Sequence, residues 1–204
     1  LKKYQYPCAP NINHLFIVRY SIEHNQPIFT TNFDCLFESA ATELGYAYEV
    51  VLPNTKGQSQ VIKEFKDQTL KKGIVYIFKL HGTIALDNKE TLSTLCLTMS
   101  SISRANLEIY EFIQFLSHRN HIVFTGYSGR DVDYFPALSE LIIKTDVYWI
   151  DKKFFGHTKK NADYVDAIKI YEYPDCFFAS IAPELKKNII EVDEFLLKMK
   201  RKIV

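Results

Sequence analysis

Two short apolar runs of the sequence end in residues that could bind a ligand or move a proton. The run at 27–31 leads into Asn32 and Asp34, and the run at 74–80 leads directly into His81 and Gly82. Amide and carboxylate groups form hydrogen bonds with polar ligands, and an imidazole can exchange a proton near neutral pH. These residue types, placed directly after apolar runs, indicate two parts of one candidate site.

Two further runs end in a similar way. The run at 121–125 is followed by a turn of sequence GYSGRD, which contains Gly126 and Ser128, and the run at 147–150 is followed by Asp151. In doubly wound sheets, ligands bind beyond the carboxyl ends of the strands. If the four runs belong to one parallel sheet, their ends reach one edge, where neighbouring strands are ~4.8 Å apart.

Each of these residues also has a structural explanation that the sequence leaves open. Asn32 or Asp34 could cap the helix that follows, because such side chains satisfy free backbone N–H groups. His81 could be a structural histidine, and the glycines of the turn could serve only its tight geometry. Asp151, which precedes two lysines, could be a solvated charge. Convergence of four strand ends is what favours a site.

The elements that would position these residues alternate along the chain. Apolar runs rich in β-branched and aromatic residues predict strands at 27–31, 48–52, 74–80, 121–125, 147–150 and 169–173. Helices are expected at 34–44, 101–117, 132–144 and near 188–202, with Gly45 ending the first. This alternation is typical of an α/β fold with a mainly parallel sheet flanked by helices.

The remaining segments suggest one domain over residues 1–204. The polar stretch 53–60 is expected to be a loop over a cleft or a connection to a small subdomain, and residues 87–90 are expected to form a turn before a short strand at 92–97. Because the chain begins without Met and ends in a helical pattern, we expect it to be a fragment of a longer protein.

Composition excludes several classes of protein. The 204 residues are 47% hydrophobic and 24% charged, which is ordinary for a globular protein, and the net charge of +1 lacks the basic excess of nucleic-acid binders. The cations at 198–202 are typical of a solvated helix end. No run approaches the ~18 apolar residues of a membrane span. The sequence therefore predicts a cytoplasmic protein that binds neither membranes nor nucleic acid.

Three of the motifs together resemble a known family. They are Thr-Thr-Asn-Phe-Asp at 30–34, Lys-Leu-His-Gly at 79–82 and Gly-Tyr-Ser-Gly-Arg-Asp at 126–131, in this order. The sequence from residue 12 to residue 151 resembles sirtuin-like domains, most of all the divergent prokaryotic branch that hydrolyses NAD in antiphage defence proteins. The resemblance implies a Rossmann-like fold and NAD as the substrate.

The resemblance also implies a role for each site residue. Asn32 would orient the nicotinamide ribose or the attacking water, Asp34 would support that pocket, and His81 would be the catalytic base. Cleavage of the nicotinamide–ribose bond builds positive charge on the ribose, and a positioned base contributes about 10²- to 10⁴-fold in rate. The residues expected to bind NAD are Thr31, Gly82, Gly126, Ser128 and Asp151.

Two features differ from the pattern of the family. No glycine occurs in residues 1–12, so the Gly-rich phosphate loop and its strand either lie upstream of residue 1 or have been lost, and the start without Met favours the first explanation. Between His81 and the 126–131 turn there is only Cys96 rather than a C-x-x-C zinc module. The four cysteines lie far apart, so we expect no zinc and no disulfide framework.

The resemblance therefore implies an NAD glycohydrolase that releases nicotinamide and ADP-ribose in antiphage defence. The alternative is a non-catalytic module that senses NAD or an ADP-ribose derivative and regulates an effector domain. An NAD-dependent protein deacylase is the third possibility, disfavoured by the missing zinc ligands. The family also implies a homo-oligomer, or a fused or associated effector domain, as the partner.

Overall fold

The computed structural model of the chain describes residues 9–53, 55–84, 95, 107–118, 121–130, 146–154, 156–171 and 174. The chain divides into two compact units, residues 1–104 and residues 105–204. The expectation of a single domain over the whole chain stays a prediction.

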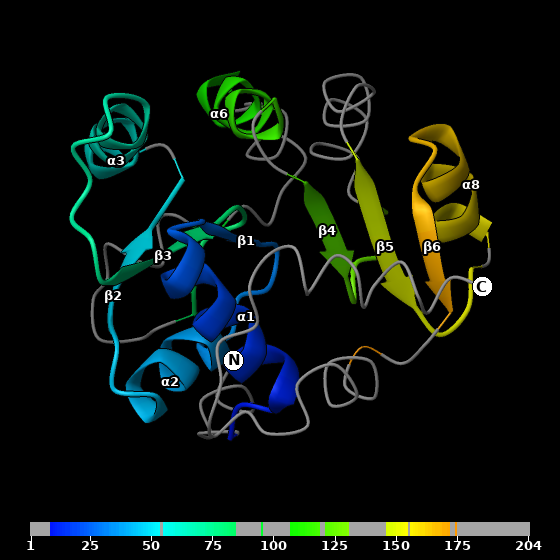
Figure 1. The fold of residues 1–204 in the computed structure, drawn as a ribbon, viewed down its shortest axis with the longest axis horizontal. Coiled ribbons are helices and arrows are strands. Elements are labelled where there is room, and N and C mark those ends of the chain that lie inside the picture. Colours follow the sequence, from blue (N-terminus) through cyan, green and yellow to red (C-terminus); the bar gives the residue numbers. More distant parts are fainter. Residues whose placement is uncertain are drawn as a thin grey trace. The chain divides into compact units, whose positions relative to one another are not determined.

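The first unit contains a three-stranded parallel sheet with helices on both faces (Figure 1). The strand order is β1-β3-β2, and β3 therefore pairs with both neighbours. The elements of this unit are α1 (Ile12–His24), β1 (Ile28–Thr30), α2 (Leu36–Glu43), β2 (Ala47–Val51), α3 (Lys56–Lys66) and β3 (Ile74–Lys79).

Alternation along β3 explains the two layers of helices, because successive side chains of a strand point to opposite faces. Val75 and Ile77 lie in a buried cluster with residues of α1 and α2. Tyr76 and Phe78, on the other face, contact the ring of Phe65 in α3 with centroids 5.4 and 6.4 Å away. Every side chain of β3 after Ile74 is buried, as expected for the central strand of a covered parallel sheet.

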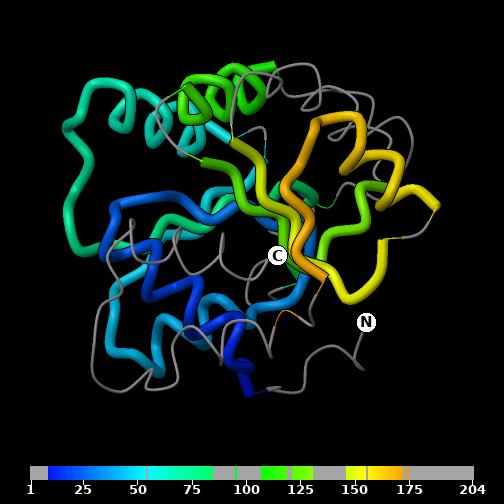
Figure 2. The backbone as a smooth tube through the Cα atoms, turned by 45° about the vertical axis from the view of Figure 1, so that its right-hand side comes forward, coloured from blue at the N-terminus to red at the C-terminus, as the bar shows by residue number. Residues whose placement is uncertain are grey.

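The second unit contains another parallel sheet, of order β4-β5-β6. These three strands run side by side in Figure 2. Its core includes Trp149 of β5, Ala162 of α8 and the neighbouring Val165, all almost completely buried. The elements are α6 (Leu107–Ser117), β4 (Ile122–Thr125), β5 (Val147–Asp151), α8 (Gly156–Tyr164) and β6 (Ile168–Tyr171).

The structure confirms the predicted α/β fold class and all six predicted strands, whose ends differ from the expected ones by at most two residues. It also confirms the first helix, which ends as the sequence suggests: Gly45 (φ 75°) and Tyr46 donate to the carbonyls of Thr42 and Ala41. The described part of the helix predicted at 101–117 is α6, in which Tyr110, Phe112 and Ile113 are buried. The predicted helices at 132–144 and 188–202, the turn at 87–90 and most of the strand at 92–97 lie outside the described residues.

The prediction of a loop at 53–60 was wrong, because α3 begins at Lys56. Thr55 caps this helix: its hydroxyl oxygen accepts a hydrogen bond from the backbone N–H of Gln58 at 3.2 Å. The buried residues of α3 are Gln58, Val61 and Ile62, and the other residues of its first turn, Lys56, Gly57 and Ser59, are exposed. Helices α1 and α8 were not predicted.

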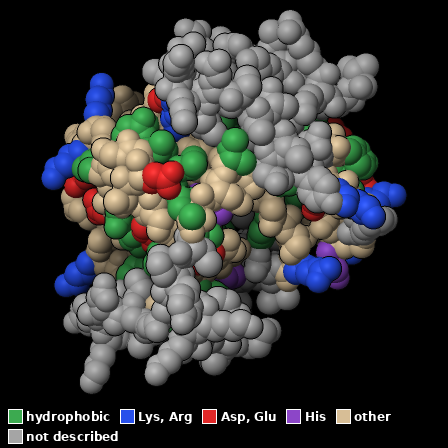
Figure 3. All heavy atoms as spheres, turned by 90° about the horizontal axis from the view of Figure 1, so that it is seen from below, with side chains coloured by type: hydrophobic (Ala, Val, Ile, Leu, Met, Phe, Trp, Pro, Cys, Tyr) green, Lys and Arg blue, Asp and Glu red, His purple; other side chains and the backbone are tan. Residues whose placement is uncertain are grey.

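Two observations on the described residues concern membranes and nucleic acid as possible partners. None of the described helices is long and apolar enough to cross a membrane. On the face shown in Figure 3, the Lys and Arg side chains that are drawn stand singly or in small groups rather than in one continuous stripe.

Candidate functional site

The register of β1 and β3 places the first two sequence motifs side by side. Thr30 pairs with Lys79, so Asn32 and His81 each lie two residues beyond the last paired position. Backbone hydrogen bonds continue past the sheet, because Leu80 donates to the carbonyl of Thr30 at 2.9 Å. The two motifs therefore share the carboxyl edge of the first sheet, where ligands bind in α/β folds.

The predicted residues at this edge differ in exposure. Asn32 is exposed, Thr31 and Asp34 are half-buried, and His81 and Gly82 are buried. The turn at Asn32 is fixed locally, because its backbone N–H donates to the hydroxyl oxygen of Thr30 at 3.1 Å. An amide open to a ligand and a sheltered imidazole thus lie on neighbouring strand ends.

His81 sits against the aromatic side chain of the neighbouring turn. Its ring centroid lies 6.2 Å from that of Phe33, with the two rings inclined by 34°. Only 9% of His81 is exposed to solvent. An imidazole in such a position is shielded from bulk water while remaining at the sheet edge.

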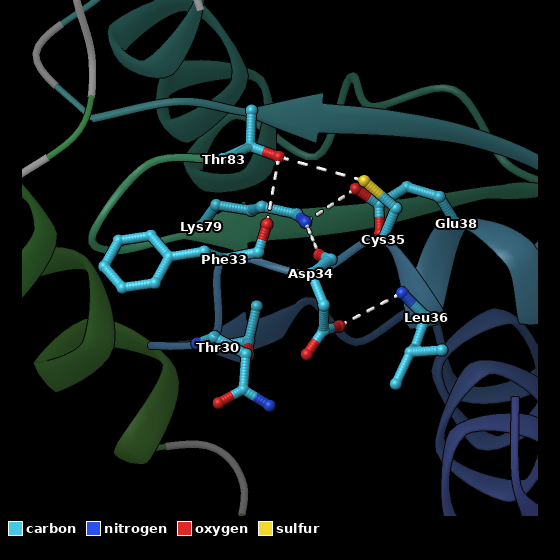
Figure 4. A network of polar contacts seen from close by, with 9 residues as sticks. Thr30, Phe33, Asp34, Cys35, Leu36, Glu38, Lys79 and Thr83 are labelled. Atoms are coloured by element: carbon cyan, nitrogen blue, oxygen red, sulfur yellow. Dashed lines mark hydrogen bonds and ion pairs between the residues drawn. The ribbon is translucent and has the colours of Figure 1, made fainter. Parts of the chain in front are cut away.

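Asp34 contacts the start of the helix that follows it, although Cys35 and not Asp34 is the N-cap residue. Its Oδ1 accepts a hydrogen bond from the backbone N–H of Leu36, the first residue of α2, at 3.1 Å (Figure 4). One carboxylate oxygen is therefore engaged in starting the helix. Support of the adjacent turn, rather than direct contact with a ligand, is the role that this geometry favours.

A buried polar network that sequence reasoning missed lies beneath this edge (Figure 4). The ammonium of Lys79 pairs with Oε1 of Glu38 at 2.7 Å and donates to the backbone carbonyl of Asp34. The Lys79 side chain is completely buried. A lysine within the apolar run Ile-Val-Tyr-Ile-Phe-Lys-Leu was the available signal, because a buried charge needs a partner.

Cys35 and Thr83 belong to the same region. The Cys35 sulfur lies 4.0 Å from the hydroxyl oxygen of Thr83. Burial raises the pKa of the Cys35 thiol, and the nearby Glu38 carboxylate raises it further, while Lys79 and Thr83 oppose these effects. The surroundings of the half-buried Cys35 therefore favour its thiol form over the reactive thiolate.

The other predicted residues lie in the second unit. Gly126 and Ser128 are exposed on the turn after β4. Asp151 is the last residue of β5. Thr125 pairs with Ile150, so the next residue on each strand, Gly126 on one and Asp151 on the other, lies just beyond this pair. The structure thus brings the turn and Asp151 to one sheet edge, and Asp151 also caps locally by accepting from the N–H of Lys153 at 3.3 Å.

Side chains from β5 and α8 bind three successive carbonyls of this turn. Trp149 Nε1 donates to the carbonyl of Tyr127 at 3.2 Å, and the Thr158 hydroxyl donates to that of Ser128 at 3.3 Å. Asn161 Nδ2 donates to the carbonyl of Gly129 at 2.7 Å. These contacts turn the carbonyls toward the protein while Ser128 stays exposed, which suits a turn that presents hydrogen-bond donors to an anion.

The residues that hold the turn could not be predicted individually. Thr158 and Asn161 lie on α8, whose sequence Gly-His-Thr-Lys-Lys-Asn-Ala-Asp-Tyr has no apolar period.

Within the described residues, no three His, Cys, Asp or Glu side chains gather as metal ligands. The predicted absence of zinc stays a prediction.

Two parallel sheets with polar residues at their carboxyl edges define a Rossmann-like α/β protein. The SIR2-like domain family matches residues 26–170, which include both strand-end motifs of the first sheet and the turn after β4. The chain belongs to the SIR2-like domain family. No curated protein matches the sequence. Because SIR2-like domains use NAD, membership of the family indicates an NAD-related function.

Proposed function

We propose that the protein is an NAD glycohydrolase that cleaves the bond between nicotinamide and ribose. The observation that carries the proposal is the β1–β3 register, which places Asn32 and His81 equally far beyond one paired position. Both residues lie within the segment that matches the SIR2-like domain family. At this one edge of the sheet, an amide can orient a ribose or a water and an imidazole can accept a proton.

The roles follow from the chemistry of the bond. As the bond between nicotinamide and the anomeric carbon breaks, its electron pair leaves with the nicotinamide, which becomes neutral, and positive charge develops on the ribose. Asn32 orients the ribose or the attacking water, whose oxygen forms the new bond, and His81 accepts the proton that water loses. Asp34 supports the turn, and Thr31 and Gly82 line the same edge.

The carboxyl edge of the second sheet carries the other residues that the family resemblance assigns to NAD binding. Gly126 and Ser128, on a turn whose carbonyls face the protein, suit the phosphates or the adenosine ribose. Asp151 suits the hydroxyls of the adenine-side ribose, as carboxylates at strand ends do in dinucleotide folds. The fit rests on the chemistry of these groups and on the exposure of Ser128.

The test is release of nicotinamide from NAD, measured by chromatography. Asn32→Ala and His81→Ala should lower the rate, the latter by about 10²- to 10⁴-fold, the range for loss of a positioned base. Gln60→Ala and His118→Ala remove an exposed amide and an exposed imidazole elsewhere and should leave the rate unchanged. Because His81 is buried, the melting temperature of each variant is measured alongside.

Other outcomes would assign a different function. Calorimetric binding of NAD or ADP-ribose with no product after hours would identify a sensing module that regulates an effector domain. Removal of an acyl group from a peptide, dependent on NAD, would identify a deacylase. Turnover retained in both Asn32→Ala and His81→Ala would show that the residue assignments are wrong.

The resemblance to NAD-hydrolysing defence proteins carries the biological part of the proposal. We propose that hydrolysis serves antiphage defence, and that the active form is a homo-oligomer or works with a fused or associated effector domain. Protection of cells against phage by the wild-type gene, lost with the His81→Ala variant, tests the first point. Size-exclusion chromatography with light scattering tests the second.

A further inference from the structure

We propose that the buried ion pair between Lys79 and Glu38 is a positioning element that fixes Asn32 relative to His81. The inference rests on the proposed hydrolase for its catalytic meaning, whereas its structural part can be tested without activity. Lys79 ends β3, two residues before His81, and Glu38 lies in the first turn of α2. The pair therefore links the strand that carries the base to the helix that follows Asn32.

One ammonium group makes both connections. Lys79 Nζ lies 2.7 Å from Glu38 Oε1 and also donates to the backbone carbonyl of Asp34 (Figure 4). Thr30 pairs with Lys79 in the sheet, and the backbone carbonyl of Asp34 accepts a hydrogen bond from the Lys79 ammonium. Only three residues lie between Thr30 and Asp34, and Asn32 is the middle one. Fixing both ends of so short a segment limits the positions that the Asn32 side chain can reach.

A second contact holds the same turn from the other side of His81. The Thr83 hydroxyl donates to the carbonyl of Phe33 at 3.4 Å, and the N–H of Ile84 donates to the same carbonyl at 3.1 Å. Residues before and after His81 thus both bind the turn after β1. The separation between the amide and the imidazole is set by these bonds as well as by the sheet.

Stability alone does not account for a charged pair at this place. Removing two charges from water is costly, and well-packed apolar residues of similar volume are often as stabilising as a buried ion pair. The Lys79 side chain is 0% exposed and that of Glu38 is 10% exposed. Among the described residues, Glu38 Oε2 is also buried without a hydrogen-bond partner. What the pair supplies and an apolar pair would not is the directed bond to the turn.

The experiment separates position from stability. The double variant Lys79→Met with Glu38→Leu replaces the pair by apolar side chains, so the melting temperature should stay near that of the wild type. Amide hydrogen exchange at Asn32 and Leu36 should nevertheless become about tenfold faster, because their bonds depend on the fixed turn. Nicotinamide release should fall about 100-fold, as expected for misplacement by about 1 Å.

Two further variants complete the design. Arg19→Met with Glu23→Leu removes a matched pair, 2.9 Å long and partly buried on α1, and should alter neither exchange at Asn32 nor turnover. Glu38→Gln keeps an oxygen acceptor for Lys79 but removes the counter-charge of a buried ammonium, so it should lower the melting temperature while keeping exchange and turnover nearer to wild-type values than the double variant does. If the double variant does not fold, Glu38→Asp provides the test, because its shorter side chain stretches the contact while keeping the charge.

The outcomes distinguish this inference from the proposed function. Unchanged exchange at Asn32 and Leu36 in the double variant, or in Glu38→Asp if that variant is used, overturns the inference whatever the activity. Faster exchange with full turnover also overturns it, since the turn would then be free to move without effect. A wild-type protein that releases no nicotinamide refutes the hydrolase, while the exchange data still show whether the pair fixes the turn.

Discussion

Replacing Gly129 by alanine tests whether the turn after β4 has the geometry described above. Gly129 has a φ of +65°, and a Cβ built there would lie 2.4 Å from Asn161 Nδ2 and 3.3 Å from Trp149 Cη2. Gly126 in the same turn has a φ of +61° and nothing within 4 Å of such a Cβ. The two glycines thus share a left-handed backbone conformation and differ in their surroundings.

The magnitudes follow from this difference. A left-handed conformation costs an alanine about 1–2 kcal/mol, which is the whole loss of unfolding free energy expected for Gly126→Ala. In Gly129→Ala, Asn161 must also move and lose its 2.7 Å bond to the Gly129 carbonyl, which adds about 0.5–1.5 kcal/mol. Gly129→Ala should therefore lower the free energy of unfolding by the larger amount.

A double variant isolates the contact. Asn161→Ala alone should cost about 1 kcal/mol for the lost hydrogen bond. In a Gly129→Ala background the same substitution should cost almost nothing, because that bond is already broken. Trp149, the single tryptophan of the chain, lies in the core of this unit, so its fluorescence during urea unfolding reports on the unit directly.

Either of two results would refute this account. Equal losses for Gly126→Ala and Gly129→Ala would mean that Asn161 does not lie against Gly129. Strictly additive costs for Gly129→Ala and Asn161→Ala would mean that the two residues do not share a bond.

Two further predictions concern the first unit. Burial lowers the pKa of His14, and the nearby Asp34 opposes this shift. The unfolded chain therefore takes up the proton at a higher pH than the folded chain does, so the unit loses stability as pH falls below about 6.5. The variant His14→Gln keeps a capping-box residue opposite Asn11 and should flatten the dependence of the urea midpoint on pH between 8 and 5. Thr55→Ala should cost about 1 kcal/mol and speed amide exchange at Gln58, measured by urea unfolding and mass spectrometry, while Thr55→Ser should retain the wild-type values.

The two central strands, β3 and β5, were predictable because nearly all of their residues are buried on both faces. A run such as Ile74–Lys79 is continuous in apolar and aromatic residues, so no knowledge of its neighbours is needed to recognise it. In α3 the apolar residues Val61, Ile62 and Phe65 all follow a polar first turn, which resembles a loop. Helix α8 gave no apolar signal at all. Only Thr158 and Ala162 of α8 are buried, so nearly every position of that helix is polar and its period is invisible in the sequence.

The residues of the candidate site were predictable where they directly follow a strand, because the end of the strand then fixes their position in the fold. Asn32 and His81 follow strands directly, and the pairing of β1 with β3 was enough to bring them to one edge. Lys79 and Asn161 act through backbone carbonyls of distant segments, at separations of 45 and 32 residues. No local pattern specifies such contacts, because they depend on which turn the folded chain places beside them.

Both units use the same physical device at their sheet edges. In the first, Lys79 binds a carbonyl of the turn after β1, and in the second, Asn161 binds a carbonyl of the turn after β4. A carbonyl oxygen carries partial negative charge, so a turn that pointed its carbonyls at a pyrophosphate would repel it. Holding the carbonyls toward the protein leaves the exposed Asn32 at the first edge and the exposed Ser128 at the second. Lys79 and Asn161 therefore influence the charge that each edge presents, because each one binds a carbonyl that would otherwise be free to point outward.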